Sequence, residues 1–457
     1  MLYKGDMMRI LARFFGSVAV LACTMQAFDY KVDGNVVSST RIGLSDNKRM
    51  DTQKGIYPNN SFWALSTQLG ISANLLKSES QTLKVGLSGM VGGVALDTTR
   101  DGNTLYPTNS TTDSTTSVGD FTSVYMPAWG DITNAYVYYK YGDYFGIRAG
   151  RYDFNNEHSV ALTDYWSGRN QGVEAFVGVK NFNIYAIYIN ARSSSNYEWL
   201  NHFEARNPNY NRYGLFVVGA NAKWNINDNH QLSFYPYVYF QPGVYTDPGI
   251  KLIYDGSFSK FKSKSTILVL HAIHDTRMRT TLSDQDWGEV AVYNNGIYQG
   301  RELGKGGTTL FLKQEFFIET HSLGAAVYKN FGNANGLISS YGDPTGLNTW
   351  VYTLYSTGPT WSDFFSQDAL NTFAFYGQKF NKWNYQLIAR YTYAPRADEN
   401  SLAFLLGYDF TEHINLNLRL EWAGTTNKAG YKLNETFLTH KVYNDKSMIF
   451  WYLTAKI

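Results

Sequence analysis

The sequence is poor in cysteine, in proline and in long apolar runs. It has 1 Cys and 10 Pro in 457 residues, whereas proline averages about 5 % of residues in proteins. Because proline lacks the backbone donor that a sheet strand needs, its scarcity favours a chain built of paired strands. Beyond residue 27, no stretch reaches the ~20 apolar residues that a transmembrane helix requires.

The sequence also lacks an excess of charge of either sign. Lys and Arg together number 40 and Asp and Glu number 38, so the formal net charge is +2. A chain that binds nucleic acid usually carries a strong basic surplus. We therefore expect no nucleic-acid partner.

The N-terminal segment predicts secretion. Basic residues precede an apolar run at 14–22, and the small residue Ala27 closes the segment. This order is typical of a cleaved signal peptide over 1–27, which leaves 28–457 as the mature chain. The alternatives are a membrane anchor, for which the run is short, and lipoprotein processing at Cys23. Cleavage after Ala27 removes the single cysteine, which excludes disulfide and thiol chemistry from the mature chain.

Aromatic residues are abundant, and they fall into alternating patterns. They make up 16 % of the chain and belong to the residue types enriched in strands. In the segment 448–457 every second residue is apolar, and the same alternation recurs in 307–318, 382–395 and 412–422. Successive side chains of a strand point to opposite faces. Repetition of this pattern in a secreted chain indicates that the apolar faces contact lipid and the polar faces line a lumen.

The pattern predicts eighteen strands, with sixteen as the alternative count. They are expected at 28–44, 61–76, 81–97, 131–142, 144–153, 172–180, 182–192, 212–224, 230–241, 249–256, 265–275, 307–318, 321–331, 370–379, 382–395, 401–410, 412–422 and 446–457. Long connections, 242–248 and 396–400 among them, alternate with compact turns. The fold class is therefore all-β, a transmembrane up-and-down antiparallel β-barrel with both termini in the periplasm. A soluble Greek-key sandwich has no reason to alternate so regularly.

Motifs for catalysis or metal binding are weak. His271 and His274 look like a metal pair, but residues three apart on a strand point to opposite faces. The glycines around Lys305 lack the following Ser or Thr and the helix of a phosphate loop. The sequence shows no Gly-x-Ser-x-Gly nucleophile motif. We therefore expect no metal, no cofactor, no catalytic residue and no enzyme activity.

The third long connection, 154–171, is rich in charged and aromatic side chains. Its candidate site residues are Glu157, His158, Asp164, Tyr165, Trp166 and Arg169. The run Gly-Arg-Tyr-Asp at 150–153, the run Trp-Ser-Gly-Arg-Asn-Gln-Gly at 166–172 and the Val-rich strand that follows resemble the putative outer-membrane-protein (Hof) family of Helicobacter and its relatives. That family is similar, more distantly, to the OprD-type substrate-specific porins.

The resemblance implies a pore constriction and a charged lining. In those porins the third loop folds into the barrel and narrows it, and a ladder of basic residues lines the opposite wall. Residues of this chain in plausible lumen phase are Arg148, Glu174, Lys313, Glu315, Arg390, Arg419 and Glu421. Because acidic residues accompany the basic ones, the charge selectivity of the passage stays open at this point.

We expect an outer-membrane channel through which small polar solutes diffuse. Its expected partners are outer-membrane lipid and lipopolysaccharide, the barrel assembly machinery and the solutes. The terminal residue is Ile457 rather than the Phe common in such barrels, so recognition by the assembly machinery would rest on Trp451 and Leu453. One alternative is an adhesin that binds through long loops such as 98–130. Another is an enzyme at the outer rim. Solute identity and the choice between monomer and trimer are left open.

Overall fold

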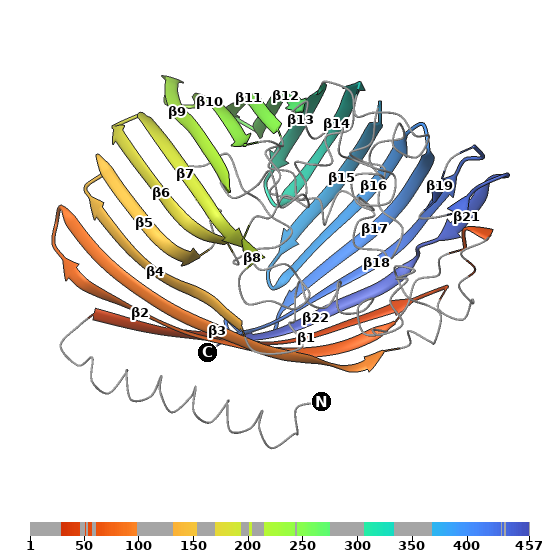
Figure 1. Cartoon of the computed structure of the whole chain (residues 1–457), viewed down its shortest axis with the longest axis horizontal. Coiled ribbons are helices and arrows are strands. Elements are labelled where there is room, and N and C mark those ends of the chain that lie inside the picture. Colours follow the sequence, from red (N-terminus) through yellow and green to blue (C-terminus); the bar gives the residue numbers. More distant parts are fainter. Residues whose placement is uncertain are drawn as a thin grey trace.

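Strands form where the sequence alternates, as β16 (Trp383–Tyr393) demonstrates. Its outward side chains Trp383, Leu387 and Tyr391 are 45 %, 42 % and 48 % exposed. The intervening Ile388 and Arg390 are buried on the inner face. In the computed structural model, residues 29–45, 51, 54–56, 61–97, 131–152, 170–192, 201–202, 214–242, 245–274, 306–332, 368–430, 432–433 and 436–456 are described. They curve into one barrel wall (Figure 1).

The wall is built from eighteen long strands. They are β1 (Asp29–Gly43), β2 (Phe62–Lys77), β3 (Gln81–Asp97), β4 (Asp131–Tyr141), β5 (Phe145–Tyr152), β6 (Asn170–Val179), β7 (Phe182–Arg192), β9 (Leu215–Asn227), β10 (His230–Gln241), β11 (Tyr245–Ser257), β12 (Lys262–His274), β13 (Gly306–Ile318), β14 (His321–Gly332), β15 (Leu370–Phe380), β16, β17 (Ala397–Asp409), β18 (Ile414–Asn427) and β22 (Met448–Lys456). The main sheet also contains two short additions, β8 (Asn201–His202) and β21 (Val442–Asp445), which bring it to 20 strands.

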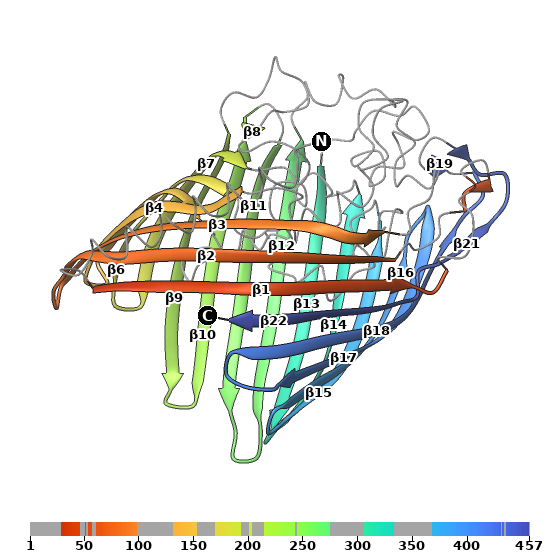
Figure 2. The same cartoon turned by 90° about the horizontal axis from the view of Figure 1, so that it is seen from below.

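The barrel closes between its first and last strands. Consecutive long strands pair antiparallel around the wall, and β1 pairs with both β2 and β22. Arg41 of β1 lies opposite Phe62 on one side and Phe450 on the other. Figure 2 shows β1 and β22 side by side at this seam. The predicted up-and-down antiparallel barrel and the predicted count of eighteen are confirmed.

Two connections that the sequence pattern predicted to be long are short. β11 begins at Tyr245, and β17 begins at Ala397, so that only three residues separate it from the end of β16. The predicted strand began at 249, yet Pro248 already pairs with Val238 inside the ladder. The polar residues 398–400 resembled a loop, but they pair with the end of β16. The connection predicted at 423–445 is also partly strand, because β21 pairs with the outer end of β18.

The two ends of the barrel differ. At one end, turns of two to four residues join the strands, and the first residue of β1 and the last of β22 lie at this end. Several of these turns have a residue with positive φ, such as Lys180, Glu319 and Asn381, as tight hairpins favour. The longer connections, the small hairpin of β19 (Lys432–Leu433) and β20 (Thr436–Phe437), and β21 lie at the other end. In outer-membrane barrels the short turns are periplasmic and the long loops extracellular.

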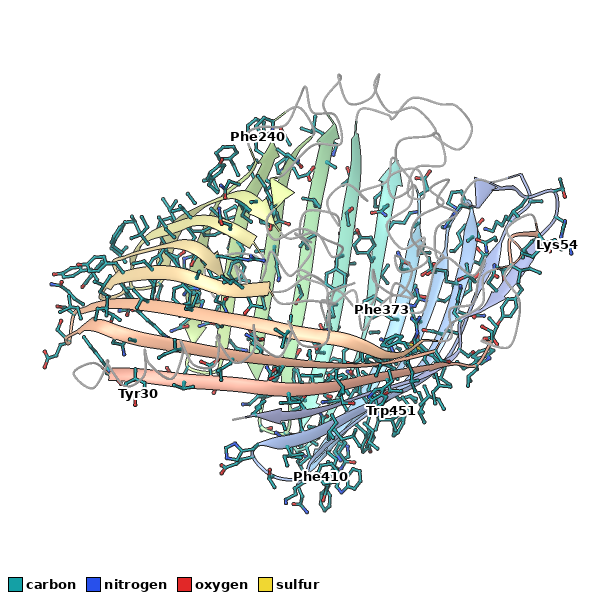
Figure 3. The ribbon with its side chains drawn as sticks, turned by 60° about the horizontal axis from the view of Figure 1, so that its bottom comes forward. Tyr30, Lys54, Phe240, Phe373, Phe410 and Trp451 are labelled. Carbon is teal, nitrogen blue, oxygen red and sulfur yellow. The ribbon has the colours of Figure 1, made fainter. Side chains whose placement is uncertain are left out.

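Aromatic side chains gather on the outer face near both ends. At the periplasmic end the Trp383 and Tyr408 rings pack with centroids 4.3 Å apart, and Tyr408 contacts Phe410. Figure 3 shows Phe410 at this edge. At the extracellular end Tyr393 and Trp422 are exposed. These positions match the two aromatic girdles of a membrane barrel. Among the described residues, no helix is long and apolar enough to cross a membrane.

Candidate functional site

The inner face of the barrel carries the charged residues that the sequence singled out. Arg148, Glu174, Lys313, Glu315, Arg390, Arg419 and Glu421 alternate along their strands with outward apolar side chains such as Ile147, Val173, Leu312, Tyr391 and Leu420. All seven therefore lie in lumen phase. Their contact with a passing solute stays a prediction.

Arg148 is held flat against the wall by aromatic rings. Its guanidinium carbon lies 4.7 Å from the Tyr138 ring centroid and 4.8 Å from that of Tyr152. Its Nε lies 4.0 Å from Oε1 of Glu174, the residue opposite on β6. Gly150 has φ +123° and passes so close to β4 that a Cβ there would meet the Ala135 carbonyl oxygen. This backbone conformation favours glycine. Gly150 lies two residues before Tyr152, whose side chain is buried.

Lys313 and Glu315 form an ion pair along β13. Nζ of Lys313 lies 2.9 Å from Oε1 of Glu315. The ammonium also lies 5.1 Å from the Phe375 ring centroid. Residues two apart on a strand share a face, so the sequence spacing alone places these two charges together. The pair is accessible enough to meet water in the lumen.

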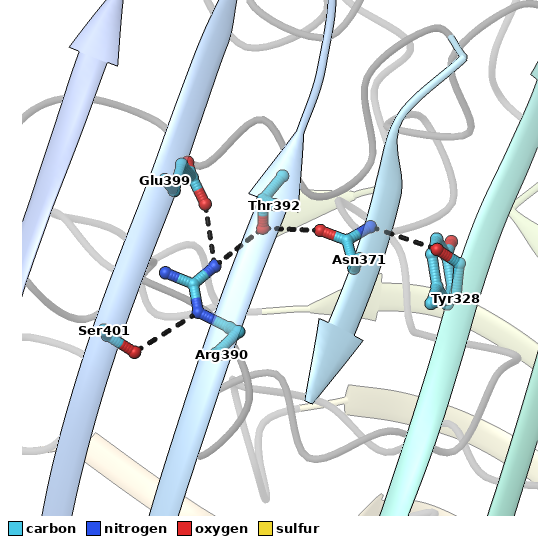
Figure 4. Close-up of polar contacts among 6 residues, drawn as sticks. All are labelled: Tyr328, Asn371, Arg390, Thr392, Glu399 and Ser401. Atoms are coloured by element: carbon cyan, nitrogen blue, oxygen red, sulfur yellow. Dashed lines mark hydrogen bonds and ion pairs between the residues drawn. The ribbon is translucent and has the colours of Figure 1, made fainter. Parts of the chain in front are cut away.

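Arg390 is the centre of a buried polar network across β14 to β17 (Figure 4). Its Nη1 donates to Oε2 of Glu399 at 2.7 Å and to Oγ1 of Thr392 at 3.0 Å. Thr392 in turn donates to Asn371, whose amide reaches the Tyr328 carbonyl oxygen. The Arg390 and Glu399 side chains are 1 % and 0 % exposed. Such a pair fixes the relative positions of neighbouring strands, because removing one partner leaves a buried charge.

The fourth charged pair lies on β18. Nη2 of Arg419 is 2.5 Å from Oε2 of Glu421. Phe450 and Met448 of β22 lie opposite these two residues, and all four are buried. Arg148, Arg390 and Arg419 therefore each have a carboxylate partner on their own or the adjacent strand. The predicted lining residues thus form compensated pairs rather than an unbroken basic ladder.

The inner face over β6 to β12 is mixed. Its buried apolar and aromatic side chains include Phe176, Tyr185, Ile187, Val217, Tyr237, Tyr239, Leu268 and Leu270, which we call the apolar cluster. Buried polar side chains lie on the same strands, among them Glu174, Asn221, Gln241, Asp247 and Thr266. At the periplasmic end, hairpins β9–β10 and β11–β12 enclose a polar pocket of about 450 Å³ that includes Gln231, Asp255, Lys262 and Lys264. The inner face over β6 to β12 therefore carries apolar and polar side chains together.

Six buried charged residues were not among the predicted lining residues: Arg41, Arg151, Asp247, Arg396, Glu399 and Lys446. Arg41 lies on the inner face of β1 with its guanidinium carbon 5.0 Å from the Phe62 ring centroid, and its strand phase was a usable signal. Glu399 was assigned to a loop. Lys446 follows β21 in the extracellular connection. Burial and the nearby Arg41 lower the pKa of Lys446 to about 7, while Asp445 opposes this shift.

The six candidate constriction residues lie outside the described residues. Glu157, His158, Asp164, Tyr165, Trp166 and Arg169 fall in 153–169, and their role stays a prediction. The predicted signal peptide, the Phe28 start and Ile457 also lie outside them. Within the described part of the chain, no three His, Cys, Asp or Glu side chains come close enough to hold a metal ion.

Three comparisons place this barrel among known proteins. The sequence matches the model of a family described as "putative outer membrane protein" over residues 15–457. OccAB2 of Acinetobacter baumannii has a similar fold, with TM-score 0.64, 12 % identity, and coverage of 94 % of this chain and 98 % of that one. OccK9 (OpdG) of Pseudomonas aeruginosa gives the same TM-score, identity and coverage. OpdK of Pseudomonas aeruginosa, crystallised with vanillate, gives 0.60 and 12 %, again with 94 % and 98 % coverage. None of the curated proteins matches the sequence.

These findings agree with the girdled outer face and with the unequal ends of the barrel. The TM-scores of 0.64 and 0.60 to the solved structures show a shared fold. The family match covers almost the whole chain. The protein is an outer-membrane β-barrel, and it belongs to the family of putative outer membrane proteins.

Proposed function

We propose that the barrel is a channel through which small polar solutes diffuse across the outer membrane. The observation that carries this proposal is the closed wall of eighteen long strands with a charged inner face. Barrels of 16–18 strands leave an aqueous passage, whereas about eight strands leave room only for side chains. Ion pairs inside such a wall are stable when water or their partners solvate them.

We further propose that the channel favours solutes with both a polar group and an apolar face. The compensated charges over β13 to β18 supply hydrogen-bonding groups of both signs. The apolar cluster of β6 to β12 supplies packing surface. Selectivity in a pore follows from its width and from the groups that line it. OpdK was crystallised with vanillate, which supports a small organic molecule as the class to test first.

The connection 154–171 is our proposed constriction. It follows β5, the position at which the resembling porins carry their inward loop. Its carboxylates and its Tyr165–Trp166 pair suit a segment that packs against a wall and faces ions. We also propose that the assembly machinery inserts the barrel by reading the outer face of β22, where Leu453 is exposed.

Swelling of proteoliposomes tests the channel proposal. Vesicles containing the folded protein, placed in isotonic solutions of neutral solutes of increasing size, should swell quickly with small solutes and progressively more slowly with larger ones. Vesicles with heat-unfolded protein serve as the control. Folded protein that leaves swelling at the control rate for every solute would overturn the proposal.

A further inference from the structure

A polar pocket lies at the periplasmic mouth of the lumen. Hairpins β9–β10 and β11–β12 lie side by side there (Figure 2), and β13 completes the pocket. We propose that this pocket binds the hydroxyl groups of a neutral sugar that passes through the channel. The proposal rests on the channel function and deepens it, because it names the class of solute.

The polar side chains of the pocket point into the lumen. Gln231 on β10 lies directly opposite Asp255 on β11, and Asp255 lies directly opposite Lys264 on β12. Residues directly opposite each other share a face of the sheet. Lys264 in turn shares its face with Leu268, four residues further along β12, which is buried on the inner face. The sheet register therefore sets an amide, a carboxylate and an ammonium group side by side on three neighbouring strands.

The charges in this row alternate in sign, yet two of them are unpaired. Lys264 lies between Asp255 on β11 and Glu315 on β13. Glu315 pairs with Lys313 instead. Within the described part of the chain, neither Lys264 nor Asp255 takes part in an ion pair or a side-chain hydrogen bond. Because an ammonium group has three donors and a carboxylate has two acceptor oxygens, the pocket presents unused donors and acceptors next to each other.

An amide pair and an aromatic ring flank these charged groups. Nε2 of Gln231 donates to Oδ1 of Asn225 at 2.9 Å, which orients the Gln231 amide and uses one of its two N–H donors. On the other side, Phe317 of β13 lies directly opposite Lys262 and borders the pocket with its ring 37 % exposed. Small-molecule sites combine aromatic side chains with a few placed polar groups in this way. The ring can pack against the C–H face of a sugar whose hydroxyls reach the polar row.

The balance of charge in the pocket selects a neutral ligand. Its lining includes two ammonium groups, Lys262 and Lys264, and two carboxylates, Asp228 and Asp255. An anion or a cation would therefore meet like charges as well as opposite ones. A hydroxyl group both donates and accepts, so it can bond a carboxylate and an ammonium group at once, and adjacent hydroxyls of a sugar repeat this arrangement. The volume of about 450 Å³ lies within the roughly 300–1,000 Å³ of small-molecule sites.

The chain offers a matched control at the same end of the barrel. Asp409 is the last residue of β17 and shares its inner face with Glu399, ten residues earlier on the strand. It does not line the pocket. Asp409→Ala therefore removes a periplasmic, lumen-facing carboxylate, as Asp255→Ala does, but leaves the pocket intact.

Titration of the purified, folded protein with glucose, followed by saturation-transfer NMR in a detergent without sugar headgroups, tests the proposal. The wild type should bind glucose weakly and saturably, because each hydrogen bond to the sugar replaces one to water. Asp255→Ala should weaken binding about ten-fold, the effect of losing one hydrogen bond to a charged group. Asp409→Ala should bind like the wild type. Raising the salt concentration from about 0.05 to 0.5 M should leave the affinity unchanged, because screening acts on charged ligands.

Absence of glucose binding to the wild type would overturn the proposal, and so would equal weakening by Asp255→Ala and Asp409→Ala. If Asp255→Ala assembles poorly, competition on the wild type decides the matter. Tetraethylene glycol dimethyl ether is neutral but has no hydroxyl groups, so it should leave bound glucose in place. Displacement of glucose by this ether or by acetate would contradict recognition of hydroxyl groups in a neutral ligand.

The NMR readout needs neither a membrane nor a current, so it separates this proposal from the channel proposal. A barrel that passes solutes but does not bind glucose would overturn the sugar site alone. A barrel that binds glucose but leaves vesicle swelling at the control rate would overturn the channel and leave the pocket as a sugar site.

Discussion

Leu418 and Asn417 are neighbours on β18 whose side chains point to opposite faces of the wall, Leu418 to lipid and Asn417 to the lumen. Substitution by arginine should therefore change the stability of the barrel very differently at the two positions. Leu418 lies on the outer face, opposite Leu406 and Trp451. Asn417 lies on the inner face, opposite Gly407. Arginine on the lipid face near mid-bilayer costs about 2–4 kcal/mol, which lowers the folded-to-unfolded ratio about 30- to 700-fold. Asn417→Arg places its charge in the lumen, where Gly407 leaves room for it.

Folding of the two variants into lipid vesicles, followed through the urea dependence of the folded fraction, measures this difference. Leu418→Arg should unfold at clearly lower urea, while Asn417→Arg should stay close to the wild type. Each variant keeps the other residue native, so each is the control of the other. Equal loss of stability in the two variants would refute the assigned phase of β18 and with it the division of the wall into lipid and lumen faces.

Three further outcomes are expected. Glu399→Ala leaves the buried Arg390 guanidinium without its carboxylate and should cost about 3–5 kcal/mol in urea unfolding, whereas replacing both residues by apolar ones should cost less. The pKa of Lys446 is lowered to about 7 in the folded protein, so between pH 7 and about 10.5 the unfolded chain binds one proton more than the folded chain. The free energy of unfolding should therefore rise with pH over this range. Lys446→Met should abolish that rise when unfolding is measured at pH 7 and pH 9.5. Deleting 156–163 should raise single-channel conductance if that segment narrows the passage, and a folded deletion variant with unchanged conductance would rule the role out.

The alternation of side chains was sufficient to predict the barrel. Every long strand falls close to its expected position, because a lipid face tolerates few polar residues and so leaves a strict period of two. The predicted strand boundaries were wrong where the outward side chains are polar. At the extracellular end of β17 the outward Asp398 forms an ion pair with Lys428 at 2.8 Å. In the sequence, a strand end that carries such polar residues looks like a loop.

The candidate site was harder to predict than the fold. The alternation of side chains along each strand places Arg148, Arg390 and Arg419 on the lumen face. It does not show which side chains on neighbouring strands these arginines pair with. Glu399 meets Arg390 only through the register of β16 against β17. Register depends on turn length and on the start of each strand, and the start of β17 was misplaced. Compensation of the lumen charges is therefore a property of the assembled sheet rather than of any single strand.

The most direct test of the account is the conductance of the purified protein in planar bilayers, with the reversal potential measured in a salt gradient. A channel of this architecture should give discrete, stable conductance steps. Because the pairs Arg148–Glu174, Lys313–Glu315, Arg390–Glu399 and Arg419–Glu421 are compensated, we also expect a reversal potential close to zero rather than strong anion selectivity. Correctly folded protein that inserts without conductance steps would contradict the central claim that this barrel is a channel.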